Sequence, residues 1–93
     1  MKISEFQRQM ARIYLERDRA RGVDATLAWL VEELGELSKA VRKGSKAEVA
    51  HEAGDLLAWL ASLCNQLEVD LEEEAKRYSD GCPKCAGSPC RCP

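Results

Sequence analysis

The chain has 93 residues, of which 45% are apolar and 32% are charged, a composition typical of one small globular domain and not of a disordered segment. Its formal net charge of −2 excludes the strong basic field of a general nucleic-acid-binding protein, so we expect no nucleic-acid partner. No apolar run approaches the roughly 20 residues of a membrane span, and the charged N-terminus lacks the apolar core of a signal peptide. We therefore expect a cytoplasmic protein without membrane association.

The residue types favour helices. Alanine, leucine, glutamate, lysine and arginine dominate, whereas β-branched and aromatic residues are scarce. A chain this short buries only about 60–65% of its unfolded surface when it folds. We therefore expect a metal, disulfides or self-association to add stability.

The first predicted helix runs from the N-terminus to Gly22, which we expect to be its C-cap. Its apolar residues recur at helical spacing: Phe6, Met10, Ile13 and Tyr14. The second predicted helix spans about residues 25–43, capped by Asp24 or Thr26 and stopped by Gly44. Its apolar stripe consists of Leu27, Leu30, Val31, Leu34, Leu37 and Val41.

A capping box, Ser45-Lys46-Ala47-Glu48, opens the third predicted helix. The apolar face of this helix consists of Val49, Ala53, Leu56, Leu60, Leu63 and Leu67. A fourth helix begins after Asp70 and continues to about Tyr78. No segment alternates with the period of two that indicates a half-buried strand, so we predict an all-α fold, a compact antiparallel bundle of about four helices. Residues 1–80 would form this helical domain, and residues 81–93 a short cysteine-rich C-terminal tail.

Two acidic motifs lie on consecutive predicted helices. The second helix contains the pattern EExxE, with Glu33 and Glu36 one turn apart, and the third contains ExxD, with Glu52 and Asp55 at the same spacing. Each pair borders an apolar stripe, so packing of the stripes would bring the four carboxylates together. The four charges would repel unless some carboxylates were protonated or a divalent cation bound, and the cation is the better answer. Ligands that are all oxygen favour Mg²⁺ or Mn²⁺. The alternative for each motif alone is an ordinary solvated acidic face.

Gly35 and Gly54 lie inside these two motifs, although glycine costs a helix roughly 1 kcal/mol relative to alanine. The missing side chains predict either a close approach of the two helices or room for a ligand.

The segments LVEELGELSKAVRKG (residues 30–44) and EAGDLLAWL (residues 52–60) resemble the MazG-type nucleotide pyrophosphohydrolases of the all-α NTP pyrophosphatase superfamily. The resemblance covers roughly residues 1–80 and leaves the cysteine-rich tail outside. It implies Mg²⁺ binding by Glu33, Glu36, Glu52 and Asp55, and hydrolysis of nucleoside triphosphates to monophosphates and pyrophosphate. It also implies a homodimer or homotetramer, which would complete the bundle, and a house-cleaning role in the nucleotide pool.

Other residues near the motifs suit this chemistry. Glu33, and after it Glu32, are candidates for the general base that takes a proton from water. Lys39 and Lys43 could contact the pyrophosphate, although they could equally be solvated lysines.

Trp59, one turn after Asp55, could stack on the nucleobase, as could Trp29 by similar geometry, unless both belong to the core. We expect His51 to be a surface residue near the site.

A related alternative is a phosphoribosyl-ATP pyrophosphohydrolase of histidine biosynthesis, which also carries paired acidic motifs. Leu34-Gly35-Glu36-Leu37 is more similar to the MazG type, which we therefore prefer.

Four cysteines lie in the tail, in a CPxC motif (Cys82 and Cys85) followed by a C-x-C motif (Cys90 and Cys92). CPxC is common in zinc knuckles, so the favoured ligand is structural Zn²⁺, with disulfides or a disordered tail as alternatives. Cys64, on the third helix, is expected to be a small buried apolar residue. Non-enzymatic alternatives are a helical, zinc-binding interaction module and a purely structural helical dimer.

Overall fold

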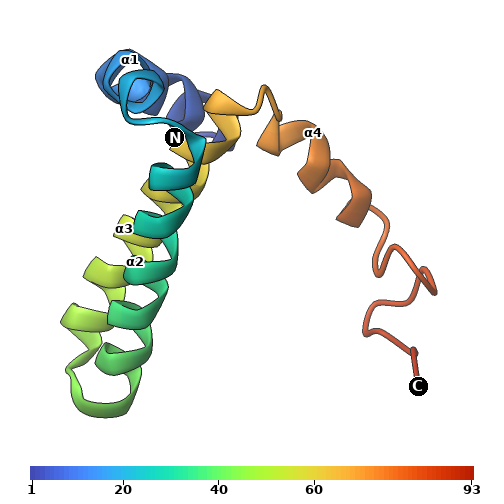
Figure 1. The fold of residues 1–93 in the computed structure, drawn as a ribbon. Coiled ribbons are helices and arrows are strands. Elements are labelled where there is room, and N and C mark those ends of the chain that lie inside the picture. The colour runs from blue at the N-terminus through green and yellow to red at the C-terminus, as the bar shows by residue number, and fades with distance from the viewer.

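The computed structural model describes residues 1–93 and contains helices but no strands (Figure 1). They are α1 (Ile3–Arg21), α2 (Val23–Lys43), α3 (Lys46–Gln66) and α4 (Leu71–Ala75), followed by one 3₁₀ turn, η1 (Lys76–Tyr78). The predicted all-α class is therefore confirmed. The predicted fourth helix is shorter than expected, because its last turn is 3₁₀.

Helices α2 and α3 form an antiparallel hairpin joined only by Gly44 and Ser45 (Figure 1). The predicted capping box is present: the Glu48 amide donates to Ser45 Oγ at 3.2 Å, and the Ser45 amide donates to Glu48 Oε1 at 3.4 Å. These bonds satisfy two amides that a helix start leaves without partners. The cap therefore fixes where α3 begins.

Gly22 separates α1 from α2 with a φ of 96°, in a region that side chains disfavour. Its amide donates to the carbonyl of Asp18 at 2.9 Å and ends α1, as predicted. The same residue directly precedes α2, so the expected caps Asp24 and Thr26 are wrong, and both lie within the first turns of the helix. Thr26 is fully buried and donates its hydroxyl to the Gly22 carbonyl at 3.2 Å.

Helix α1 crosses one end of the hairpin and packs mainly on α3 (Figure 1). Met10, Ala61 and Cys64 are buried near this junction, and the predicted burial of Cys64 is confirmed. Only nine of the 93 residues are buried, so the core of a single chain is small.

Helix α4 and the tail extend away from the hairpin (Figure 1). The radius of gyration is 15.4 Å, whereas a compact domain of this length would have about 12 Å. The close packing therefore involves the first three helices. None of the helices combines the length and the apolar character that crossing a membrane would require.

The apolar stripe of α2 does not pack on α3 as a whole, contrary to expectation. Leu30 and Leu37 are half-buried, but four other members are exposed: Leu27 (47%), Val31 (59%), Leu34 (54%) and Val41 (65%). These four residues are called the α2 apolar face below. Helical spacing gathers these four residues on one exposed flank of α2.

Candidate metal and nucleotide site

Four carboxylates from the two motifs come together between α2 and α3. They are Glu33, Glu36, Glu52 and Asp55, called the acid cluster below. Partial desolvation is the largest cause of a raised pKa at Glu33. The negative charges of the other three members raise the pKa of Glu33 further, as does a hydrogen bond with the Glu52 side chain.

No lysine or arginine forms an ion pair with the acid cluster. The one basic side chain in contact with it is His51, whose Nε2 lies 3.3 Å from Asp55 Oδ2. The His51 side chain is 72% exposed. His51 is thus a surface residue, as expected, but its contact with Asp55 was not predicted. One donor atom each from His51, Glu52 and Asp55 lie within 4.8 Å of one another, close enough for one ion.

Glu32 lies outside this group. Its side chain is exposed, and it is not among the charges that raise the pKa of Glu33. The two glycines of the motifs have open space where a side chain would begin: nothing lies within 4 Å of a Cβ built on Gly35 or Gly54. The expected close approach of the two helices at these glycines is therefore wrong, and both positions are exposed to solvent.

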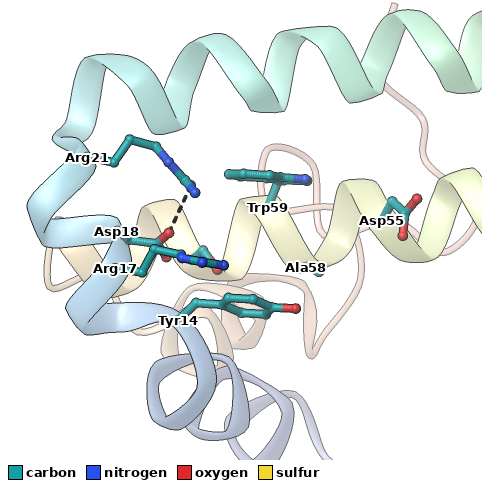
Figure 2. Close-up of a pocket in the computed structure, with 8 residues that line it drawn as sticks. Tyr14, Arg17, Asp18, Arg21, Asp55, Ala58 and Trp59 are labelled. Carbon is teal, nitrogen blue, oxygen red and sulfur yellow. Dashed lines mark hydrogen bonds and ion pairs between the residues drawn. The ribbon is translucent and has the colours of Figure 1, made fainter.

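A cavity of about 240 Å³ lies between α1 and α3, next to Asp55 (Figure 2). Its lining combines aromatic rings, two arginines and carboxylates: Tyr14, Arg17, Asp18, Arg21, Asp55, Ala58, Trp59 and Ser62. We call it the aromatic cavity. Figure 2 shows the rings of Tyr14 and Trp59 on opposite sides of it, with the Arg17 side chain reaching in between.

Trp59 lines this cavity, whereas Trp29 stacks on Trp59 with ring centroids 5.9 Å apart and planes inclined by 14°. The guanidinium of Arg21 lies 5.1 Å from the centre of the Trp59 ring, within cation–π range. Trp29 therefore supports the indole of Trp59 and does not line the cavity itself.

Asp18 is almost completely buried at the edge of the aromatic cavity. Its Oδ1 accepts from Arg21 at 3.1 Å, and its Oδ2 has no hydrogen-bond partner. The motifs did not indicate this residue, nor the other contributions of α1. Tyr14, Asp18 and Arg21 do recur at helical spacing, but the sequence does not show that this face of α1 meets α3.

A second cavity, of about 280 Å³, lies at the turn of the hairpin. Glu36 and Glu52 of the acid cluster line it together with the two predicted lysines, Lys39 and Lys43. We call it the lysine cavity. Glu48 also lines the lysine cavity, so three carboxylates accompany its two lysines. The acid cluster lies between the aromatic cavity and the lysine cavity, because Asp55 borders the first and Glu52 the second.

The four tail cysteines form a second cluster, with their Sγ atoms all within 4.8 Å of one another. Amides of Arg91 and Gly87 lower the pKa of Cys85 to about 6, because hydrogen-bond donors stabilise the thiolate. Amides of Cys85 and Lys84 likewise lower the pKa of Cys82. The neighbouring sulfurs of Cys90 and Cys82 raise the pKa of Cys92 to about 11. The cluster is therefore able to hold a metal ion.

The fold and the acid cluster define a class, that of small all-α proteins with carboxylates gathered between two consecutive helices. The family model of the MazG nucleotide pyrophosphohydrolase domain matches residues 21–84, well over half of the chain. The chain belongs to this family, and its predicted resemblance is confirmed. No curated protein matches the chain.

Proposed function

We propose that this protein hydrolyses nucleoside triphosphates to monophosphates and pyrophosphate, using Mg²⁺ or Mn²⁺ held by Glu33, Glu36, Glu52 and Asp55. Membership of the MazG family supports nucleotide pyrophosphohydrolysis in general. The observation that carries the specific proposal is the order of three features along the hairpin: aromatic cavity, acid cluster, lysine cavity. This order matches a nucleoside triphosphate, which has an aromatic base at one end and phosphates at the other.

The acid cluster suits a hard divalent cation. Its ligands would be carboxylate oxygens, and its negative charge has no lysine or arginine ion-pair partner. When bound, the cation would offset the charge of the phosphates and orient the phosphoanhydride bond.

The nucleoside would occupy the aromatic cavity, with its base beside the Trp59 ring that lines it. Stacking on an aromatic ring suits any base, and Arg17 and Arg21 add donors for ribose or phosphate oxygens. The phosphates would extend past the acid cluster towards Lys39 and Lys43, whose ammonium groups would stabilise the departing pyrophosphate.

Cleavage of the α–β phosphoanhydride bond requires water to form a new P–O bond while pyrophosphate leaves with the bridging oxygen. A carboxylate must accept the proton of that water. We assign this role first to Glu33, which lies inside the acid cluster, and second to Glu32, the preceding residue of α2, whose exposed side chain lies outside it.

We further infer that the protein forms a homodimer or homotetramer. One chain buries few apolar residues and leaves the α2 apolar face exposed. We expect a second copy of the chain to bury this face in an interface. The cellular role that fits the proposed reaction is removal of unwanted nucleotides from the cytoplasmic pool.

The direct test incubates the purified protein with Mg²⁺ and a panel of NTPs, dNTPs and phosphoribosyl-ATP, and separates the products by ion-exchange chromatography. We expect equal amounts of monophosphate and pyrophosphate. Glu36→Gln and Asp55→Asn should each lower the turnover by about 100-fold or more, because each removes a charged ligand. Glu16→Gln, on the exposed surface of α1, is the matched control and should keep the wild-type rate.

Three results would contradict the proposal: no turnover by the wild type, undiminished turnover in both acid variants, or release of single phosphate. Turnover of phosphoribosyl-ATP alone would instead favour the histidine-biosynthesis alternative.

A further inference from the structure

The cysteine tail lies apart from the acid cluster and takes no part in the proposed hydrolysis. Every hydrogen bond of residues 82–92 stays within the tail, and Gly81 joins it to the helices through one bond, from its amide to the Tyr78 carbonyl at 3.3 Å. Gly87 is its one buried residue, so no apolar core holds these residues together. Something other than apolar packing must therefore specify the conformation of the tail.

The sulfur positions match a tetrahedral metal site. Cys82 Sγ lies 3.7 Å from Cys92 Sγ, and Cys85 Sγ lies 3.9 Å from Cys90 Sγ. Four sulfurs at the usual Zn–S distance of about 2.3 Å would lie about 3.8 Å apart in a regular tetrahedron. All four sulfurs also lie within 4.8 Å of one another, so small movements would complete the geometry.

The backbone around the sulfurs is arranged to support thiolates. The amides of Arg91 and Gly87 donate to Cys85 Sγ at 3.2 and 3.4 Å, and the Cys92 amide donates to Cys90 Sγ at 3.3 Å. Such donors offset part of the negative charge on metal-bound sulfur.

The turns of the tail also require residues without bulky side chains. Gly81 has a φ of 113°, and a Cβ there would lie 2.8 Å from the Ala86 carbonyl oxygen. A Cβ on Gly87 would lie 2.8 Å from the Pro89 carbonyl oxygen and 3.0 Å from Arg91 Nη1. These close approaches wrap the chain around the four sulfurs.

We propose that Cys82, Cys85, Cys90 and Cys92 bind one structural Zn²⁺, which serves as the core of residues 81–93. Zinc accepts four thiolates in a closed tetrahedral site, with no open position for catalysis. Binding forms four Zn–S bonds, and each sulfur that still carries a proton releases it to the buffer. The resulting unit carries a net charge of −2, which Lys84 and Arg91 of the same segment offset.

The test uses the full chain, purified with reductant, and measures bound metals by mass spectrometry. We expect one Zn²⁺ per chain with nanomolar or tighter affinity. Replacement by Co²⁺ should give the absorption bands of a tetrahedral four-thiolate site. Cys85→Ser combined with Cys90→Ser should abolish binding, whereas Cys64→Ser, in the buried part of α3, should retain one Zn²⁺.

A second measurement separates loss of zinc from loss of the fold. A zinc chelator should collapse the dispersed amide signals of residues 81–93 in NMR spectra while the far-UV circular dichroism of the helices remains. The proposal is overturned if the reduced wild type binds no stoichiometric zinc, if the cluster holds iron and sulfide instead, or if the double variant keeps its zinc. The zinc measurements test this proposal separately from the proposed hydrolysis, because the nucleotide assays depend on the acid cluster and not on the tail cysteines.

Discussion

Gln7 connects three parts of the chain through one buried side chain. Its amide nitrogen donates to the Val69 carbonyl at 2.7 Å, and its amide oxygen accepts from the Leu71 amide at 3.0 Å. The backbone carbonyl of Gln7 accepts a further hydrogen bond, from the Asn65 side chain at 3.0 Å. Gln7 therefore holds the connection between α3 and α4 against α1.

We predict that Gln7→Leu lowers the free energy of unfolding by about 2 kcal/mol, because it leaves two part-buried backbone groups, the Val69 carbonyl and the Leu71 amide, without these partners. For a domain of this size, the melting temperature should fall by about 10 °C. Gln9→Leu, whose amide contacts only Arg12, should change stability by less than about 0.5 kcal/mol. Both are measured by thermal unfolding at one protein concentration. Equal melting temperatures for Gln7→Leu and wild type would show that other contacts hold α4.

Trp59 offers a residue-scale test of nucleotide binding. Trp59→Ala should raise KM for the preferred triphosphate about tenfold, which corresponds to loss of one aromatic stacking interaction, and should change kcat little. Trp59→Phe should restore most of the affinity. Steady-state kinetics checks this; a fall in kcat with an unchanged KM would instead place Trp59 outside the nucleotide site.

At the scale of elements, the end of α3 is strained. Glu68 has a φ of 57°, in the left-handed region, because the Val69 amide turns back to donate to the Cys64 carbonyl at 2.9 Å. This is the arrangement in which glycine usually follows a helix.

We predict that Glu68→Gly raises the free energy of unfolding by about 1 kcal/mol, since glycine adopts this conformation without strain. Glu16→Gly, inside α1, should lower it by about 1 kcal/mol because glycine weakens a helix interior. Chemical denaturation of both variants measures the two values. If Glu68→Gly instead lowers the free energy of unfolding, the contacts of the Glu68 side chain stabilise the fold by more than its left-handed backbone conformation destabilises it.

Local sequence signals predicted the elements well, and the relative rotation of the elements poorly. The capping-box motif Ser45-Lys46-Ala47-Glu48 predicted the start of α3, because the cap depends on neighbouring residues alone. Gly22 was recognised as an end but not as the immediate start of α2, since one residue serves both helices. The two acidic motifs indicated their own convergence because they lie on adjoining helices. The α1 side of the aromatic cavity depends on how α1 crosses α3, which no local pattern encodes.

At the scale of the whole molecule, the α2 apolar face predicts association. Val31→Asp should give a monomer at concentrations where the wild type associates, because burying a carboxylate in an apolar interface is costly. Val69→Asp, the same substitution in the loop between α3 and α4, should leave the assembly intact. Analytical ultracentrifugation of the three proteins checks this. A wild type that sediments as a monomer throughout would refute the proposed assembly.

The two-residue turn between α2 and α3 also bears on the order of folding. Both acidic motifs lie on the two arms of this hairpin, so assembling the acid cluster requires closure of only a short stretch of chain. The entropy lost in that closure is small, and contacts between near neighbours in sequence form early. The acid cluster should therefore assemble before α1 docks. Repulsion among its carboxylates should slow the closure of the hairpin until a cation binds.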